Sequence, residues 1–338
     1  MFEPTRLPAP LFARALPLLA ACVLLPGLAS ATQNSPPGHD YPVSKKPKPP
    51  TVADRMPKTA LMHQSLSIIR YNPLGLQHEH RLMWRMRLSD SDKILWKDTY
   101  VAFGPEIMAT PSLQRFGVRL QAKPIAVFEF FALAEYLYFL GNFDYVQSYK
   151  DAAADFSTEA QKAATERGEN YSALIGKVSV SGRLQAKVGP IAVRSTNRMS
   201  RFWFDAKDEH KVFFDIYTDL LTPVNGWTFW QDNDVLYING RLIVGLRHTW
   251  SQSFLSDDAM QPVAADAPAP NVTHRVGPII AYRLRDDPKY GDTWYRRPTL
   301  LVLAQWWVKH PYRTGQEISQ AIPWLVVGFA FNGRVANL

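Results

Sequence analysis

The chain has 338 residues, a formal net charge of +8 and a single cysteine, and aromatic side chains make up 12% of it. After the N-terminal region no run of about 18 apolar residues occurs, which excludes a helical membrane protein. The basic balance is typical of proteins that meet nucleic acid, anionic membrane surfaces or acidic ligands.

The N-terminal segment has the features of an export signal. Arg6 and Arg14 precede an apolar run from Leu16 to Leu28, and Ala29-Ser30-Ala31 follows as an A-x-A cleavage site. We therefore predict that residues 1–31 are a signal peptide that is cleaved after Ala31. Because an exported protein rarely meets nucleic acid, we expect no nucleic-acid partner and favour anionic lipid or acidic ligands.

The only cysteine, Cys22, lies inside this export signal, so the mature chain is expected to contain no disulfide and no thiol chemistry. An alternative interpretation is that Leu19-Ala20-Ala21-Cys22 is a lipobox and that Cys22 is lipidated. The apolar run continues well past Cys22 and a good A-x-A site follows it, which favours cleavage after Ala31.

Residues 32–60 form a segment rich in proline and lysine. Proline fixes φ and removes a backbone donor, so the segment is predicted to be an extended, disordered linker in the periplasm. Its basic cluster, Lys45, Lys46 and Lys48, offers a contact for anionic lipid or cell-wall polymer, although a solvated tail is the simpler interpretation. The remaining residues, 61–338, are predicted to fold as one domain.

The stretch from Ile175 to Val188 alternates between apolar and polar residues almost without a break. Val178, Val180 and Leu184 fall on one face, whereas Lys177, Arg183 and Lys187 fall on the other with the serines and glutamine between them. Side chains of a strand point to opposite faces with period two. The pattern therefore predicts a strand with one apolar and one strongly polar surface.

The same alternation recurs along most of the chain, separated by turn signals such as Asn72-Pro73-Leu74-Gly75 and Asn239-Gly240. A strand with lipid on one side and a wet lumen on the other requires this code. The predicted strands are residues 64–72, 76–88, 96–107, 113–123, 125–140, 175–188, 191–220, 227–238, 242–254, 276–285, 298–310 and 321–333.

The sequence therefore predicts an all-β fold, a transmembrane antiparallel up-and-down β-barrel of about 12 strands. The count depends on whether 191–220 is one strand with excursions, and 10 or 14 strands are the alternatives. With 12 strands, the long breaks at 141–172 and 256–271 both fall on the external side. Within the first of them, Thr158 to Arg167 is predicted to be a short helix, with Thr158 and Gln161 spaced as a capping box.

At this point the chain resembles the bacterial outer-membrane β-barrel proteins, porin-like in the broad sense. The resemblance covers roughly residues 62–335 and rests on the signal ending at Ala31, the repeated alternating strands, and the last strand with Phe331 near its end. It implies a protein of the Gram-negative outer membrane whose partners are outer-membrane lipid and the barrel-assembly machinery. In this family an aromatic residue at the extreme C-terminus is the assembly signal, whereas here the chain continues from Phe331 to Leu338.

The predicted polar faces are strongly basic, since arginine and lysine outnumber acidic residues on them. Arginine is always charged and pairs with carboxylate or phosphate, and rings of charge set the selectivity of a pore. We therefore predict a small anion-preferring pore that passes small anionic solutes. The residues predicted to line it are Arg81, Arg85, Arg87, Arg119, Lys177, Arg183, Lys187, Arg247, Arg283 and Arg285.

Two other functions remain open. If the lumenal charges pair with one another and fill a narrow barrel, the protein is a closed structural or adhesive barrel that acts through loops 141–172 and 256–271. A lipid-modifying enzyme of the outer membrane is the less favoured alternative. It would use serine and histidine on the outer face, where the pattern puts His78, His80, His248, His274 and His310. No lipase motif is present, so we expect no enzyme, no cofactor and no metal site.

Overall fold

A computed structural model describes residues 57–338 except 97, 265, 268, 288–292 and 314–321. The predicted signal peptide, the lipobox at Cys22 and nearly all of the predicted linker lie outside the described residues. The wall strands are β1 (Thr59–Tyr71), β2 (Gly75–Arg87), β3 (Tyr100–Ala109), β4 (Leu113–Ile125), β5 (Phe128–Phe139), β7 (Ala173–Val188), β8 (Ile191–Phe204), β11 (Asn225–Asn239), β12 (Leu242–Phe254), β13 (Val272–Arg283), β14 (Arg296–Lys309) and β15 (Trp324–Asn337).

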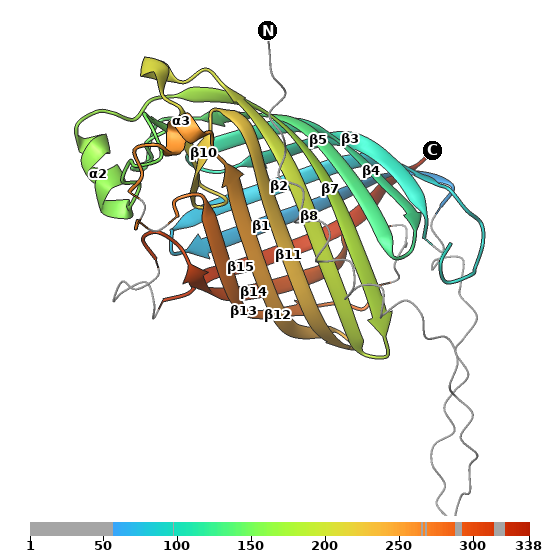
Figure 1. Ribbon diagram of the computed structural model, residues 1–338. Coiled ribbons are helices and arrows are strands. Elements are labelled where there is room, and N and C mark those ends of the chain that lie inside the picture. Colours follow the sequence, from blue (N-terminus) through green and yellow to red (C-terminus); the bar gives the residue numbers. More distant parts are fainter. Residues whose placement is uncertain (1–56, 97, 265, 268, 288–292, 314–321) are drawn as a thin grey trace, which may run out of the picture. The chain divides into compact units, whose positions relative to one another are not determined.

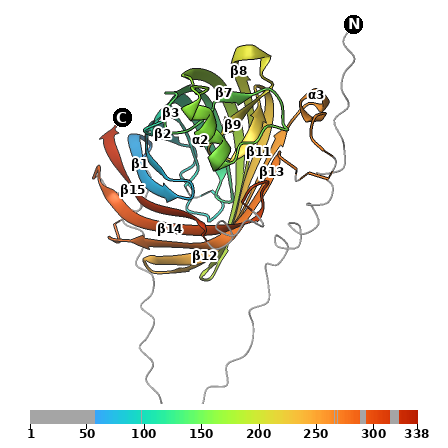
Figure 2. The same ribbon diagram turned by 90° about the vertical axis from the view of Figure 1, so that its left-hand side faces the viewer.

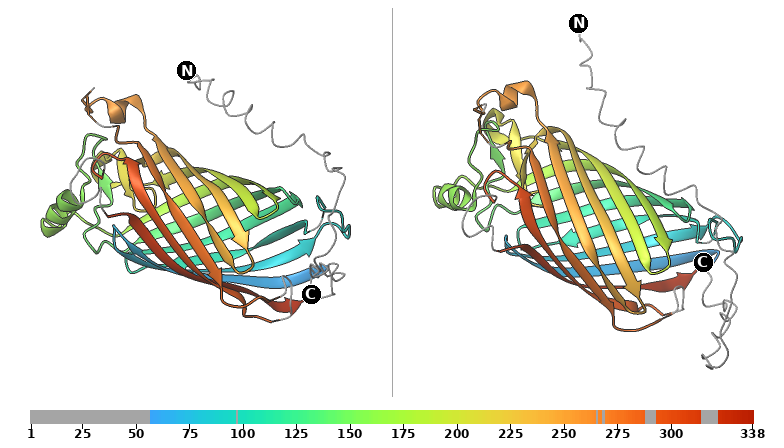
Figure 3. Two further views of the ribbon diagram at one scale, coloured as in Figure 1. Left: turned by 90° about the horizontal axis from the view of Figure 1, so that it is seen from below. Right: turned by 60° about the horizontal axis from the view of Figure 1, so that its bottom comes forward.

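These strands form one closed antiparallel barrel, in which each strand pairs with its neighbours in the chain (Figure 1). The barrel closes where β15 pairs with β1, from Leu325 opposite Tyr71 to Asn337 opposite Ala60. The prediction of a 12-stranded up-and-down barrel is therefore confirmed. Figure 3 shows that the strands are inclined to the axis of the barrel, as closure of a sheet requires.

Strand β7 shows how the alternating sequence gives the barrel an apolar outer face and a charged inner face. Val178 and Val180 are 40% and 44% exposed, whereas Lys177 and Ser179 beside them are only 8% and 3% exposed. The accessible outer face is thus apolar, and the charged face points into the barrel. Apolar surface on this scale is stable only against lipid. Within this strand the structure therefore places Val178 and Val180 outward and Lys177 and Ser179 inward.

Exposed aromatic side chains form two belts on the outer face. One lies near the ends of the strands that carry the long loops, and the other lies near the opposite ends. Such belts are typical of the two membrane interfaces of a barrel. The first includes Tyr71, Tyr138, Trp203, Trp227 and Phe254, and the second includes Trp84, Phe103, Tyr237 and Tyr282.

The two ends of the barrel differ. One end, called the loop end below, carries the connections β5–β7, β8–β11, β12–β13 and β14–β15 (Figure 1). The other, the turn end, carries tight hairpins at Gly189-Pro190 and Gly240-Arg241, together with the longer β2–β3 and β13–β14 connections. Gly240 has φ of +53°, a conformation that glycine adopts without steric cost, as the predicted Asn239-Gly240 turn requires.

The predicted strand 191–220 is wrong in its second half. β8 ends at Phe204, and a 3-10 helix η2 (Lys207–Glu209) follows it. β9 (Val212–Asp215) and β10 (Leu220–Pro223) then pair with each other and with β6 (Ser148–Tyr149) in a separate three-stranded sheet. We call residues 212–223 the plug. Seen from the loop end in Figure 2, β9 and α2 (Thr158–Glu166) lie across the mouth of the barrel.

Several element boundaries also differ from the predictions. Helix α2 is capped by Ser157, whose Oγ accepts from the Ala160 amide at 3.3 Å, so the predicted capping box at Thr158 is wrong. A second short helix, α3 (Asp257–Met260), lies in the β12–β13 loop. β3 begins at Tyr100 rather than at Trp96, and β15 continues to Asn337, well past Phe331.

Among the described residues, no helix is both long enough and apolar enough to cross a membrane.

Candidate functional site in the barrel lumen

A buried carboxylate on β3 is the centre of the densest charge cluster in the lumen. Glu106 forms ion pairs with Arg81 (2.9 Å to Nε), Arg115 (3.4 Å to Nη2) and the Nε of Arg119. Its side chain is only 2% exposed. These residues come from neighbouring strands β2, β3 and β4, whose inward positions the pairing register aligns. One carboxylate is thus shared by three guanidinium groups.

The cluster continues along the wall through β5 and β7. Glu135 pairs with Arg115 at 2.9 Å and with Lys177 at 3.1 Å. Further toward the turn end, Glu129 pairs with Arg183 at 3.1 Å and accepts a hydrogen bond from the Tyr100 hydroxyl. Register explains both contacts, because Lys177 lies opposite Glu135 and Arg183 lies opposite Glu129.

A second cluster lies on β8, β11 and β12. Asp234 accepts from Nε of Arg194 and from Nε of Arg247, each at 2.7 Å. Asp232 pairs with Arg247 at 3.1 Å and accepts from the Thr249 hydroxyl at 2.6 Å. A carboxylate this deeply buried requires such partners, because burial of an unpaired charge is strongly unfavourable.

Three further cations in the lumen lie against aromatic rings instead of carboxylates. Arg85 stacks over Tyr100 at 4.2 Å, and Arg198 lies 5.3 Å from the ring centre of Trp230. Arg275 lies 4.2 Å from the ring of Trp324. Within the part of the chain that the structure describes, no carboxylate comes within 4 Å of these three guanidinium groups. The inner wall therefore carries an excess of positive charge.

The ten residues predicted to line the lumen are arranged as follows. Nine of them occupy inward positions of wall strands, with Arg87, Lys187 and Arg283 at the turn end. The tenth, Arg285, follows the end of β13 and lies in the turn, where it pairs with Asp287 at 3.2 Å. The prediction that Arg285 lines the lumen is therefore wrong, because the strand ends two residues earlier.

The plug fills the loop end of the lumen with apolar side chains. Phe213 of β9 packs against Phe202 and Phe204 of the inner wall, with ring centres 5.2 and 5.7 Å apart. The Tyr217 hydroxyl donates to the sulfur of Met108 on β3 at 2.8 Å. Contacts with Thr273 and Ser253 extend the packing to β12 and β13. The plug therefore touches the wall on several sides.

One buried carboxylate ties the plug to the β14–β15 loop. Asp219 accepts from Nε of Arg313 at 2.5 Å, and Nε2 of His310 lies 3.3 Å from the same carboxylate oxygen. Nδ1 of His310 accepts from the Tyr312 amide at 3.0 Å, so Nε2 carries the proton. Burial alone would raise the pKa of Asp219, but Arg313 and His310 outweigh burial and hold this pKa well below its ordinary value.

Four of the five predicted histidines lie on the outer face, and the fifth lies elsewhere. His80 stacks on His63, with ring centres 5.4 Å apart. Nδ1 of His78 lies 2.8 Å from Oγ of Ser67, and Nε2 of His248 lies 3.1 Å from Nδ1 of His274. The lipid-side prediction is wrong for His310, which is buried in the loop beside Asp219.

Among the residues that the structure describes, no acidic group completes a catalytic triad with Ser67 and His78. A nucleophilic serine requires a histidine that an acidic or amide group orients. Among the described residues, no carboxylate lies within 4 Å of His78. Nor does any group of three or more histidine, cysteine or acidic side chains in the described ranges have the arrangement of a metal site.

Sequence reasoning missed three residues that matter at the loop end: Arg70, Asp219 and Arg313. Arg70 lies on the first strand, where the alternation is weak. Asp219 and Arg313 are 94 residues apart, and no local pattern links them. The only available signal was the segment 212–221, whose apolar residues do not alternate cleanly.

The closed barrel, its apolar exterior and its charged interior define the class of fold: this is an antiparallel β-barrel with the surface pattern of a transmembrane barrel. No protein-family model matches the chain, and no curated protein matches it in sequence.

Several solved structures are similar to the chain. The outer membrane protein Omp33 of Acinetobacter baumannii has 9% sequence identity and a TM-score of 0.34, covering 83% of this chain and 99% of that one. OccAB1 of the same species has 8% identity and a TM-score of 0.37, covering 80% and 65%. OccD3 of Pseudomonas aeruginosa has 8% identity and a TM-score of 0.32, covering 83% and 93%. At these identities each likeness concerns the fold alone.

Proposed function

We propose that the protein is an outer-membrane pore that prefers small anionic solutes, and that the plug closes it in the conformation described. The excess of cations on the inner wall is the observation that carries this proposal. A ring of fixed charge attracts ions of opposite sign and excludes ions of like sign from a narrow path. Outer-membrane lipid and the barrel-assembly machinery are the partners we propose for the barrel itself.

The cations toward the turn end remain accessible to solvent. The side chains of Arg183 and Arg194 are each 31% exposed, whereas the carboxylates that they contact, Glu129 and Asp234, are 7% and 0% exposed. In these two pairs the guanidinium group, and not the carboxylate, is the partner that solvent reaches. Guanidinium binds carboxylate and phosphate through parallel hydrogen bonds, so these groups suit acidic solutes.

The plug can act as a gate because it is not a member of the wall. The twelve wall strands complete their own ladder without β9 and β10. β9 and β10 pair over only four residues each, and ordering or release of such a loop segment is a common form of switching. Movement of the plug would open the loop end and leave every wall strand paired.

Reversal-potential measurements in planar bilayers with a KCl gradient test the selectivity. The wild-type barrel is expected to favour chloride over potassium. Arg198→Gln, which removes an inward cation stacked on Trp230, should reduce that preference. Arg201→Gln is the matched control on the same strand, because Arg201 lies on the outer face between Trp203 and Trp227. Cation selectivity of the wild type, or an equal effect of both substitutions, would contradict the proposal.

A closed barrel that acts through loops 141–172 and 256–271 is the second candidate. The paired charges around Glu106 and the apolar plug favour it, since together they obstruct the lumen. This candidate predicts no current from a correctly folded barrel, even when the plug is removed. The same bilayer experiment therefore separates the two functions.

A further inference from the structure

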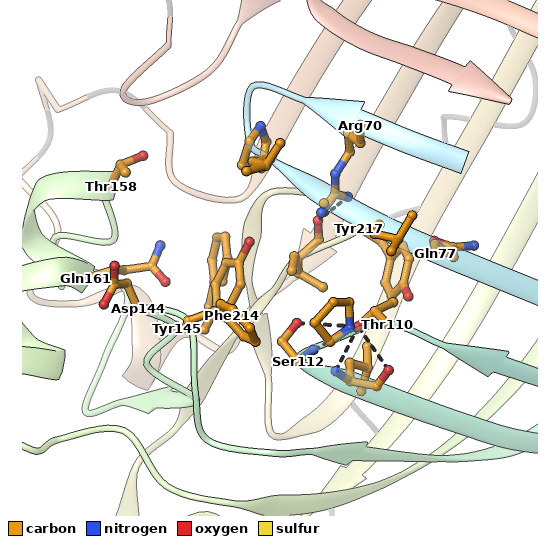
Figure 4. Close-up of a pocket in the computed structure, with 18 of the residues that line it drawn as sticks. Arg70, Gln77, Thr110, Ser112, Asp144, Tyr145, Thr158, Gln161, Phe214 and Tyr217 are labelled. Atoms are coloured by element: carbon orange, nitrogen blue, oxygen red, sulfur yellow. Dashed lines mark hydrogen bonds between the residues drawn. The ribbon is translucent and has the colours of Figure 1, made fainter. Parts of the chain in front are cut away.

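A cavity of about 620 Å³ lies beside the plug at the loop end (Figure 4). The end of β1, the start of β2 and the β3–β4 turn form one side of it, and the plug and the β5–β7 loop form the other. It is within the size range of small-molecule sites. Its lining includes Ile69, Arg70, Leu76, Thr110, Tyr145 and Tyr217.

The cavity exists because the wall is notched between β2 and β3. β3 ends at Ala109, which lies opposite His78, so residues 75–77 of β2 have no partner on β3. The chain turns away there through Thr110, whose Oγ1 accepts from the Leu113 amide at 2.8 Å. The hydroxyl also accepts from the Ser112 amide at 3.2 Å. The turn is thus held by its own side chain and leaves the notch open.

The outer part of the cavity is apolar and faces the membrane side of the wall. Ile69, Leu74 and Leu76 line it and are 59%, 74% and 55% exposed. They lie next to Tyr71, which belongs to the aromatic belt of the loop end. Such belts mark the level of the lipid headgroups. The notch therefore opens where a lipid headgroup meets its acyl chain.

The inner part of the cavity contains a cation without a carboxylate partner. Nε of Arg70 is buried and has no hydrogen-bond partner, and Nη1 donates only a long bond of 3.4 Å to the Ile216 carbonyl. Over the described part of the chain, no carboxylate lies within 4 Å of Arg70. Arg313 also lines the cavity but is already paired with Asp219. A buried guanidinium with unused donors is a site for an anion.

The Tyr145 hydroxyl contacts Arg70 but brings no negative charge to it. Burial raises the pKa of Tyr145 and of Tyr217, so both phenols stay neutral and can donate hydrogen bonds. Figure 4 shows Arg70 extending toward Tyr217 from the strand above it, with the tyrosine ring inside the cavity. The inner end therefore combines Arg70 with these neutral phenols and with Arg313, which Asp219 already neutralises, and the outer end is apolar. Asp144 of the β5–β7 loop also lines the cavity.

We propose that this cavity binds an amphiphile with one anionic group and one apolar chain. The anionic group pairs with Arg70, and the chain leaves through the notch along Leu74 and Leu76 toward the membrane. Free fatty acid and a single-chain anionic lipid share this chemistry. The site is separate from the proposed anion path, because its cation lies at the loop end beside the plug and its opening faces the outer surface.

Carbon-13 NMR with carboxyl-labelled dodecanoate, added to the full barrel in phosphatidylcholine nanodiscs, tests the site. A carboxyl resonance distinct from that of bilayer-held acid is expected for the wild type. Arg70→Gln should weaken binding at least tenfold, whereas Arg201→Gln on the outer face should leave it unchanged. Affinity should rise roughly fourfold for each methylene added between octanoate and dodecanoate, as burial of the chain requires.

Further ligands separate the possible sources and the rival explanations. Lyso-phosphatidylglycerol that binds more tightly than dodecanoate would identify a membrane lipid as the source, and the reverse order would identify free acid. Acetate that binds as tightly as dodecanoate would overturn the proposal, because the site would then recognise an anion alone. The proposal would also be overturned if the wild type showed no distinct carboxyl resonance, or if Arg70→Gln kept that resonance.

A second variant keeps the test valid if Arg70→Gln does not fold. Leu74 lies in the β1–β2 turn and is 74% exposed, so Leu74→Gln does not disturb the wall. Leu74→Gln should weaken the binding of dodecanoate severalfold and leave the binding of acetate unchanged, because only the acyl chain contacts Leu74. Equal effects on both ligands would contradict the assigned orientation.

Discussion

The two ends of the lumen are built from different chemistry. At the loop end, phenylalanines of β9 pack against phenylalanines of β8, and polar contacts between plug and wall are few. From the middle to the turn end, arginines and lysines face the interior and pair with buried carboxylates or aromatic rings. Closure and charge are thus located in different places. If the barrel is the pore proposed above, its conductance can change without a change in its selectivity.

The difference also concerns what each region tolerates. Removal of apolar plug residues leaves wall strands that are still fully paired. Removal of one carboxylate from the charge clusters leaves a buried cation without an acidic partner, as loss of Glu135 does for Lys177, and this is strongly unfavourable. The charge clusters should therefore be the rigid region and the plug the movable one.

Replacement of the plug, residues 212–223, by a glycine-serine linker of equal length should give the largest effect. The single-channel conductance should increase severalfold, because the apolar packing around Phe213 no longer fills the loop end. The anion preference should persist, since no wall cation is changed. Replacement of residues 89–92 at the turn end by a glycine-serine linker of equal length is the control, and it should leave the conductance unchanged. Unchanged conductance on replacement of the plug would mean that closure lies within the charge clusters instead.

Glu135→Gln tests the rigid region. It leaves Arg115 and Lys177 with one fewer anion in a buried site, and removal of one member of a buried pair costs about 3–5 kcal/mol. The free energy of unfolding in urea should fall by that amount. Glu166→Gln on the exposed side of α2 should change it little. Equal unfolding midpoints for the two variants would show that the cluster contributes no stability.

The sequence was sufficient to predict the wall because lipid and water select opposite residues at every position. Val178 and Lys177 illustrate this, since each neighbour in β7 faces a different solvent. The same logic failed for 212–220. Val212, Phe213 and Phe214 are apolar because they pack against the inside of the barrel, and that environment selects the same residues as lipid does.

The alternation of apolar and polar residues was also sufficient to place most lumenal cations on the inner face, but it was not sufficient for residues of the loops. Lys177 faces Glu135 because strand register brings them together, and register follows from the repeated alternation. The contact of His310 with Asp219 joins positions 91 residues apart through two loops. No periodicity governs such a contact, which is why His310 was predicted to face lipid.

Asp219→Asn tests the tie between the plug and the β14–β15 loop. The substitution removes the charge that Arg313 and His310 contact, and a hydrogen bond to a charged group contributes about 1.5–3 kcal/mol. The open probability in bilayers should rise roughly tenfold to a hundredfold. Asp286→Asn, at an exposed position of the turn end, is the control. No change in gating would show that apolar packing alone holds the plug.

Acidification should also weaken the contact between Asp219 and Arg313, but only at low pH. The pKa of Asp219 in the folded state is depressed, so its contribution to closure is complete above the ordinary aspartate pKa of about 4. That contribution decreases as pH falls below this value, because a carboxyl released from Arg313 takes up a proton more readily than the paired carboxyl does. The open probability should be flat between pH 7 and 5 with respect to this group and rise near pH 3. Asp219→Asn should lack that rise.

Arg285→Gln should give the smallest effect, and it tests where the basic part of the lumen ends. Arg285 lies beyond the end of β13, half-exposed, and pairs with Asp287 in the turn. Exposed ion pairs contribute about 0–1 kcal/mol, so the free energy of unfolding should change by no more than this amount. Reversal potentials should also stay at the wild-type value, whereas Arg183→Gln inside the barrel should shift them. A shift with Arg285→Gln equal to that with Arg183→Gln would mean that the selective region extends to the rim.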